Sequence, residues 1–166
     1  MNFKMSQVVK TPLPKSSHLW PMVQTGDFID GYAVPSDLSP KEAATIGLSM
    51  PKWADALLAL RNRLVKPLGL KTETSNTGPG AIFPIHFEND AEIILGTDDT
   101  HLNFRISILR EAGKIHMATW VHRNNMLGRA YLAIVMPFHI LIVRDAMRRI
   151  ANHKPDAPIA STAKAQ

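Results

Sequence analysis

Residues 126–151 read MLGRAYLAIVMPFHILIVRDAMRRIA and contain the longest apolar run of the chain. Nearly every residue between Ala130 and Val143 is apolar. Such a run predicts one long C-terminal helix that is buried on most of its circumference. The polar or helix-perturbing exceptions within it are Tyr131, Pro137 and His139.

A membrane-spanning role for this helix is not expected. Its uninterrupted apolar part is shorter than the roughly 20 residues that a span requires. Arg129, His139 and Arg144 also interrupt it. The N-terminus has no continuous apolar segment of the signal-peptide kind, and the chain has no cysteine. We therefore expect a cytoplasmic protein, without disulfides, thiolate metal sites or thiol nucleophiles.

Four segments upstream of the helix predict an antiparallel meander: 81–87, 91–96, 100–110 and 114–122. The segment 100–110 alternates most clearly, which is typical of a strand with one apolar face. Leu102, Phe104, Ile106 and Ile108 lie on one face, whereas His101, Asn103, Arg105 and Ser107 lie on the other.

The segments before the meander predict a strand and two short helices. DFIDGYAV, from Asp27 to Val34, predicts the strand. Ser39-Pro40-Lys41-Glu42 has the pattern of a capping box and begins a helix that ends near Gly47. A second helix is expected from Pro51 to about Val65, followed by a polar loop over 70–80. Prolines in residues 1–25 predict an extended arm, with Leu13, Leu19 and Trp20 as the side chains to pack on the domain.

This order of elements predicts an α+β fold, in which a twisted antiparallel sheet packs around the long C-terminal helix. At 166 residues the chain is expected to hold one domain, over 26–152, with the arm before it and a flexible tail over 153–166. A twisted sheet wrapped around a helix leaves a space between them, and the two short helices would close one end.

Several motifs resemble a bacterial family known as the domain of unknown function 2867, DUF2867. They are GTDDTHLNFR at 96–105, GRAY at 128–131, PFH at 137–139 and the region from Trp53 to Leu70. The resemblance covers roughly 27–151. The family's layout is similar to the helix-grip fold of START and Bet v 1-like proteins, which often hold an apolar ligand between sheet and C-terminal helix. The resemblance therefore implies a fold and a place for a ligand, but no reaction.

No cofactor or metal is expected. Some relatives are fused behind a nucleotide-binding oxidoreductase domain, but this sequence has no Gly-rich phosphate loop, nucleophile elbow or dinucleotide fingerprint. No pair of histidines has the His-x-x-x-His spacing of a helical metal site. The net charge is +5, but the basic residues are scattered, which argues against a nucleic-acid partner.

The first group of candidate site residues is polar and lies in and after a predicted turn: Asp98, Asp99, His101 and Arg105. Two carboxylates beside a histidine suit a general base, ligand contacts or a divalent metal site. The structural alternative is a hairpin turn followed by the solvent face of a strand. The same alternative holds for His116, Trp120 and His122, whose aromatic face would otherwise suit a partner surface or a shallow site.

His139 is a further candidate for a site residue, because it lies in an apolar run and needs a hydrogen-bond partner if it is buried. A backbone carbonyl or a water could supply that partner, or His139 could anchor a ligand in an apolar cavity. Pro137 removes one intrahelical hydrogen bond and should bend the helix beside it.

Three functions follow as alternatives. The first is a binding module for a small apolar ligand, with candidate contacts His139, Tyr131, Phe104, Phe83, Met117, Arg105, His101 and Asp99. The second is an enzyme that uses a histidine of the same pocket as acid or base. The third is a structural protein that forms a homodimer, because the helix is apolar on more than one side.

Overall fold

The computed structural model describes residues 7–49, 59, 63, 66–68 and 83–153. The elements follow the order β1 (Val9–Lys10), a 3₁₀ turn η1 (Trp20–Met22), β2 (Phe28–Pro35), α1 (Pro40–Gly47), a second 3₁₀ turn η2 (Lys66–Leu68), β3 (Ile85–Glu88), β4 (Glu92–Asp98), β5 (Leu102–Glu111), β6 (Lys114–Arg123) and α3 (Met126–Asn152). The predicted α+β fold is confirmed.

Two predicted segments fall largely outside this description. Of the second short helix, predicted from Pro51 to Val65, only Ala59 and Arg63 are described, and both are helical. The predicted loop over 70–80 lies outside the described residues, as does the tail from 154 onward.

The strands form one antiparallel sheet of six strands in the order β1-β2-β6-β5-β4-β3. The predicted meander supplies four of them. The predicted first strand joins as β2 beside β6, and the short β1, which has no sequence signal of its own, pairs with β2 through Val9 and Lys10. The sheet is therefore wider than the meander and has β2 near its edge.

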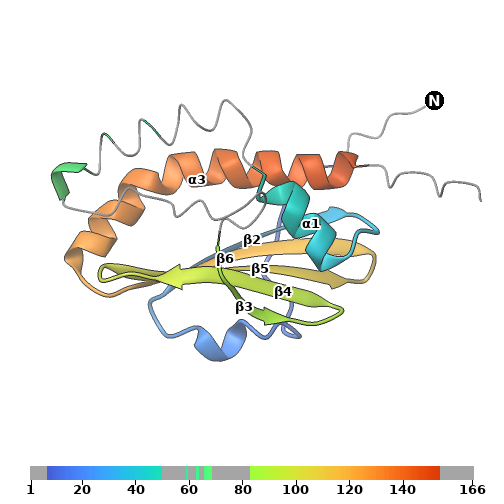
Figure 1. Cartoon of the computed structure of the whole chain (residues 1–166), viewed down its shortest axis with the longest axis horizontal. Helices are drawn as coiled ribbons and strands as arrows, with labels where there is room; N and C mark the ends of the chain where they lie inside the picture. The colour runs from blue at the N-terminus through green and yellow to red at the C-terminus, as the bar shows by residue number, and fades with distance from the viewer. Residues whose placement is uncertain (1–6, 50–58, 60–62, 64–65, 69–82, 154–166) are drawn as a thin grey trace, which may run out of the picture.

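Both faces of the sheet are covered (Figure 1). Helices α1 and α3 lie on one face, and the chain between β1 and β2 crosses the other. The first core contains Tyr32, Val34, Ile108, Ile115 and Met117 beneath the helices. The second core lies under the N-terminal arm and contains Leu13, Leu19, Ile94, Leu109, Ala118 and Trp120. The arm thus covers the face of the sheet for which the alternating sequence pattern predicted polar residues. His116 and Trp120 therefore do not lie on a face open to solvent.

The arm can cross β2 because residue 31 is a glycine. A Cβ atom there would lie 2.4 Å from the Thr11 carbonyl oxygen and 3.3 Å from the Leu13 nitrogen. The backbone of Thr11 also donates a 2.9 Å hydrogen bond to the Gly31 carbonyl. Any larger residue at this position would push the arm off the sheet.

Helix α1 begins with the predicted capping box. The Ser39 hydroxyl accepts from the Glu42 nitrogen at 3.2 Å, and the Ser39 nitrogen donates to the Glu42 carboxylate at 2.8 Å. At the other end Gly47 lies so close to α3 and β6 that an added Cβ would meet Ile150 and Met117 at 3.0 Å. Helix α1 therefore closes the space between the sheet and the second half of α3.

Arg149 fastens α1 to α3. Its Nη1 donates to the carbonyls of Ile46 and Ser49, each at 2.6 Å, and its Nε binds Asp145 at 2.9 Å. The guanidinium thus satisfies carbonyl groups that the end of a helix leaves without intrahelical partners.

Arg149→Met is expected to lower the free energy of unfolding by about 2 kcal/mol, because hydrogen bonds to a charged donor contribute about 1.5–3 kcal/mol. Urea denaturation followed by circular dichroism would measure it. Arg148→Met, on the exposed side of the same helix, is the control and should change stability by less than about 0.5 kcal/mol. Equal effects of the two changes would contradict this role of Arg149.

Helix α3 starts against the β4–β5 turn and bends along its length (Figure 1). Asn125 caps it through a 3.0 Å bond from the Gly128 nitrogen. A Cβ on Gly128 would lie 2.1 Å from the His101 carbonyl oxygen, so only glycine permits this close approach. Pro137 lies inside the helix, where a proline is an established cause of bending.

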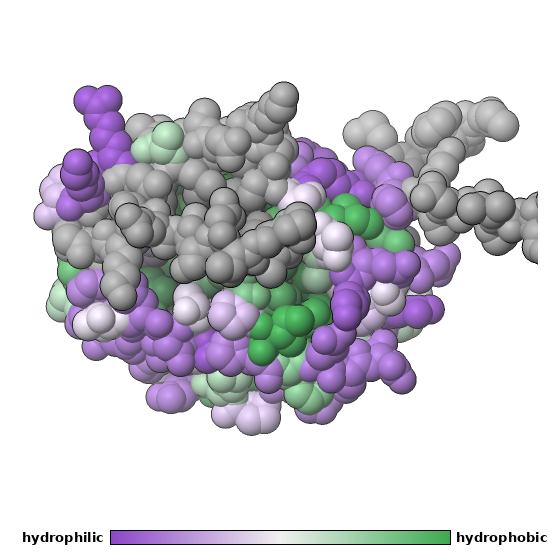
Figure 2. Space-filling model, viewed as in Figure 1, coloured by the Kyte–Doolittle hydropathy of each residue, from purple (hydrophilic) through white to green (hydrophobic). Residues whose placement is uncertain are grey.

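The described residues that are visible in Figure 2 are mainly hydrophilic, with separate hydrophobic patches among them. The exposed large apolar side chains among the described residues are Val9, Ile85, Met126, Ile140 and Leu141.

Candidate functional site

The two halves of α3 are buried very differently. Apart from Gly128, every buried residue of the helix lies in its second half: Val143, Ala146, Met147 and Ile150. These four belong to the core beneath α1. The first half, up to Ile142, is strongly apolar but supplies no fully buried side chain. The second half of α3 therefore contributes buried side chains to the core, whereas the first half carries apolar side chains of intermediate or full exposure.

Several large apolar side chains on the same side of the sheet are also half-buried, and Ile106 and Phe83 among them pack against the core beneath α1. Phe28 on β2 and Phe104 and Ile106 on β5 are all of intermediate exposure. Phe83 packs edge-on against Phe104, with ring centroids 4.9 Å apart. Val135 is half-buried on α3. Aromatic rings left half-exposed in this way give an apolar surface that a small molecule can cover.

A buried carboxylate meets His139 beside these side chains. Asp30 on β2 is 9 % exposed, and its Oδ2 lies 3.1 Å from the Nε2 of His139. The ring of Phe28 lies edge-on to His139, with centroids 6.3 Å apart. The partner of His139 is thus a carboxylate rather than the backbone carbonyl or water that the sequence suggested. Because a carboxylate only accepts, Nε2 is the donor in this contact, and in the neutral form of the ring Nδ1 is an acceptor.

Asp30 was missed as a site residue, although the sequence holds a signal for it. In the strand FIDGYAVP, alternation places Phe28, Asp30, Tyr32 and Val34 on one face. One carboxylate among three apolar residues on a buried face is unusual and needs a partner. Burial raises the pKa of the Tyr32 phenol, and the nearby Asp30 carboxylate raises it further.

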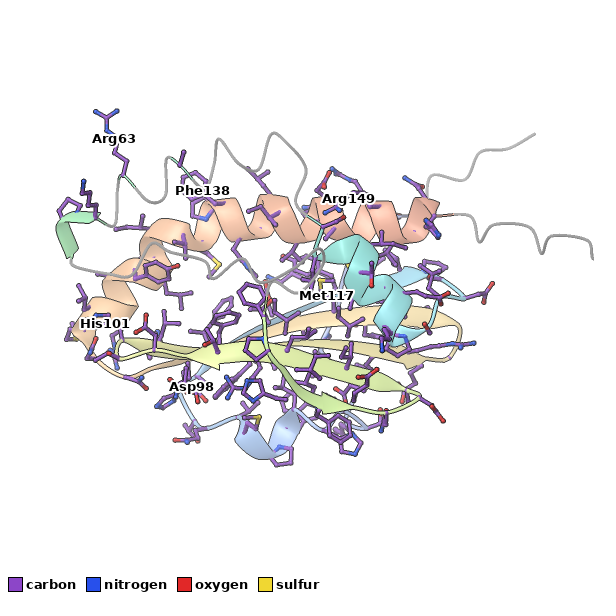
Figure 3. The ribbon with its side chains drawn as sticks, viewed as in Figure 1. Arg63, Asp98, His101, Met117, Phe138 and Arg149 are labelled. Carbon is purple, nitrogen blue, oxygen red and sulfur yellow. The ribbon has the colours of Figure 1, made fainter. Side chains whose placement is uncertain are left out.

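The other predicted contact residues do not all lie in this region (Figure 3). Met117 is 2 % exposed and belongs to the filled core near α1. Tyr131 is half-buried on the first half of α3. His101 lies at the turn before β5, where its Nδ1 is 3.3 Å from the Asn125 amide nitrogen. Asp99 binds the Thr100 nitrogen at 2.6 Å within the same turn.

Arg105 lies on the opposite face of the sheet, under the N-terminal arm. It is 5 % exposed, and its Nη1 binds Asp98 at 2.7 Å and the Phe104 carbonyl at 2.8 Å. The hydrogen bond from Arg105 is the main cause that lowers the pKa of Asp98. Arg105 therefore stands apart from His139, with the sheet between them.

Two carboxylates fasten the arm and the start of β2 to the sheet. Glu92 is fully buried and accepts from the hydroxyls of Ser17 and Ser107 and from the backbone nitrogen of His18. Asp27 accepts from His122 Nδ1 at 2.6 Å and from Trp120 Nε1 at 2.8 Å. Burial raises the pKa of Asp27, but hydrogen bonds from Gln24, His122 and Trp120 outweigh it, so the net pKa is lowered.

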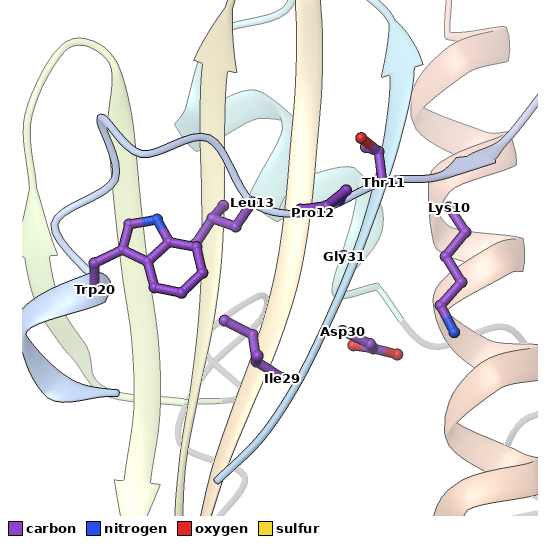
Figure 4. A pocket seen from close by; sticks show the side chains of 8 residues that line it. All are labelled: Lys10, Thr11, Pro12, Leu13, Trp20, Ile29, Asp30 and Gly31. Carbon is purple, nitrogen blue, oxygen red and sulfur yellow. The ribbon is translucent and has the colours of Figure 1, made fainter. Parts of the chain in front are cut away.

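A pocket of about 240 Å³ lies at the edge of β2 (Figure 4). The arm forms one wall and Ile29, Asp30 and Gly31 form the other, with Trp20 at one end. The pocket thus lies along the part of β2 that β1 leaves unpaired. It touches the Asp30–His139 pair only through Asp30.

Comparison with known proteins gives one family. The family model "Protein of unknown function (DUF2867)" matches residues 22–146, which is more than half of the chain. The chain belongs to the DUF2867 family. No curated protein and no solved structure matches the chain.

The DUF2867 match includes Asp30, the sheet from β2 to β6 and α3 as far as Ala146. It therefore covers the Asp30–His139 pair and the half-buried aromatic residues. Within the described residues of this DUF2867 chain, no group of three or more His, Asp or Glu side chains is placed to hold a metal ion.

We expect His116 of this DUF2867 chain to make the free energy of unfolding depend on pH. It lies under the arm, and its Nδ1 has no hydrogen-bond partner among the described residues. Burial lowers the pKa of His116 below its ordinary value of 6.5. The folded state therefore binds a proton less readily than the unfolded state, and stability should fall as the pH drops below about 6.5.

We expect His116→Gln to reduce this fall in stability between about pH 7 and pH 5. Urea denaturation at a series of pH values would measure it. His153→Gln, at the exposed C-cap of α3, is the control and should leave the pH profile unchanged. A His116→Gln profile that coincides with the wild type would contradict the assignment.

Proposed function

We propose that this protein binds a small, largely apolar molecule between the sheet and the first half of α3, with the polar end of the molecule at His139. The observation that carries the proposal is the contrast along α3. Its second half contributes Val143, Ala146, Met147 and Ile150 to the core, whereas its first half is not fully buried and carries His139, which contacts the buried Asp30.

The chemistry of the pair suggests the kind of ligand. Asp30 holds the Nε2 proton of His139, and Nδ1 has no partner in the described part of the chain. An acceptor beside a carboxylate favours a hydroxyl or another neutral donor over an anionic group. Phe28, Phe104 and Val135 would contact the apolar body. We therefore propose an apolar ligand with a hydroxyl-like end, such as a long-chain alcohol.

An enzyme that uses the same pair is the second candidate. A carboxylate that orients an imidazole is a common arrangement for a general base. Asp30 and His139 form such a pair, with a 3.1 Å contact, on the side of the sheet that α3 covers. Such an enzyme would act on the same class of small apolar molecule, so binding of that molecule is the first property to test.

Binding can be tested with N-phenyl-1-naphthylamine, an uncharged apolar molecule that fluoresces more strongly in an apolar site. Val135→Trp, one helical turn from His139, should fill the proposed site and weaken binding at least about tenfold, a loss of about 1.4 kcal/mol. Ala133→Trp, on the exposed side of the same helix, is the matched control and should bind as the wild type does.

Circular dichroism must show that both variants keep the wild-type helix content. If the two tryptophan variants lose affinity equally, or if neither does, the ligand does not lie between α3 and the sheet and the proposal fails.

A further inference from the structure

The side of α3 that faces away from the sheet carries exposed apolar residues together with three arginines. Six exposed residues at helical spacing define this outer stripe: Met126, Arg129, Pro137, Leu141, Arg144 and Arg148. Met126 is 74 % exposed at the start of the helix and Leu141 is 56 % exposed, with Ile140 beside Leu141 at 36 %. Large apolar residues grouped on an exposed helix face commonly mark a contact surface.

The apolar character of α3 exceeds what the core of this protein requires. By length and composition the helix could cross a membrane, yet only 11 % of the residues in its apolar window are buried. A helix that served the core alone would bury most of such a window. Some of its apolar surface is therefore available for another contact.

The charges of α3 restrict what that contact can be. The helix contains four arginines, and Asp145 is its only carboxylate. That carboxylate is bound by Arg149 at 2.9 Å, on the side toward α1. Arg129, Arg144 and Arg148 on the outer stripe therefore have no carboxylate of α3 to offset their charge.

A second copy of this chain fits the outer stripe poorly. Two antiparallel copies would bring Arg129 of one helix near Arg144 and Arg148 of the other, and two parallel copies would align identical arginines. Like charges at close range oppose association. An anionic partner would instead favour association, because it attracts each arginine while the side chains of Leu141 and Met126 are removed from water.

We propose that the outer stripe of α3 docks on the surface of a membrane that contains anionic lipids. Helices with this pattern lie in the plane of the interface, with apolar side chains at the boundary of headgroups and acyl chains and basic residues among the headgroups. The net charge of +5 adds a general attraction to the same surface. This contact lies on the opposite side of α3 from the proposed ligand site and does not depend on it.

Co-sedimentation of the full-length protein with vesicles tests the docking. We expect binding to phosphatidylcholine vesicles that contain phosphatidylglycerol, little binding to pure phosphatidylcholine, and loss of binding near 1 M salt, where the screening length is about 3 Å. Arg144→Gln/Arg148→Gln should weaken binding about 30-fold, since each basic residue at such a surface contributes about fivefold. Leu141→Gln should weaken it as well.

The control is Arg110→Gln/Lys114→Gln, which removes the same charge from exposed positions of the β5–β6 hairpin. It should bind within about threefold of the wild type. Equal losses in both double variants, or no binding to the phosphatidylglycerol vesicles, would overturn the proposal. A dimer in light scattering that Leu141→Gln dissociates, together with absent vesicle binding, would assign the stripe to self-association and also overturn it.

Discussion

Glu92→Gln is expected to lower the free energy of unfolding by about 3 kcal/mol, because the change weakens several charge-assisted hydrogen bonds in a fully buried site. The Glu92 carboxylate accepts from Ser17, from Ser107 at 2.6 Å, and from the nitrogen and Nδ1 of His18 at 2.8 and 3.0 Å. A glutamine offers only one acceptor oxygen, and its amide nitrogen would face the His18 donor. Urea denaturation would measure the loss.

The same change should release the N-terminal arm before the sheet unfolds. Ser17 and His18 are held to β4 mainly through this carboxylate, whereas the sheet has its own backbone ladder. Limited proteolysis should therefore cut the variant within the arm at lower protease concentration than the wild type.

Glu88→Gln is the control for Glu92→Gln. Glu88 also lies on the β3–β4 hairpin, but it is exposed and forms a 3.4 Å ion pair with the exposed Lys41. Exposed pairs of this kind contribute about 0–1 kcal/mol. If Glu92→Gln is as stable as Glu88→Gln, Glu92 does not hold the arm.

His139→Phe is expected to weaken the binding of decanol about tenfold and to leave binding of N-phenyl-1-naphthylamine within about twofold. Phenylalanine keeps the apolar contact with Phe28 but removes the acceptor that would hold a hydroxyl group. Displacement of the fluorescent molecule by decanol, measured for both proteins, separates the two effects.

His153→Phe serves as the control for His139→Phe, because His153 is exposed at the C-cap of α3 and should not affect either ligand. Loss of both ligands in His139→Phe would indicate a change in the shape of the site. Unchanged decanol affinity would show that His139 is not the polar anchor.

Local patterns in the sequence predict most of the fold. Alternation from Leu102 to Ile108 identifies a strand of the sheet, and the Ser39–Glu42 box identifies the start of α1. The apolar run after Met126 identifies the long helix, whose observed bounds differ from the predicted ones by one residue at the C-terminal end. In each case residues close in sequence determine the element.

The covered second face and the polar pairs could not be predicted in the same way. The arm is rich in proline and has no periodicity, and its position depends on Gly31 and Glu92, which are distant in sequence from Ser17. The Asp30–His139 contact joins residues 109 positions apart. The sequence predicts that a buried His139 needs a hydrogen-bond partner, but it does not identify Asp30. Asp30 comes to lie beside His139 because β2 pairs with β6 under α3.

Native mass spectrometry of freshly purified wild-type protein, alongside the Val135→Trp variant, tests the proposed ligand site most directly. The site between the sheet and the first half of α3 predicts a bound small molecule on the wild type and the bare polypeptide mass for the variant. Wild-type protein without any bound molecule, or the same adduct on both proteins, would contradict it.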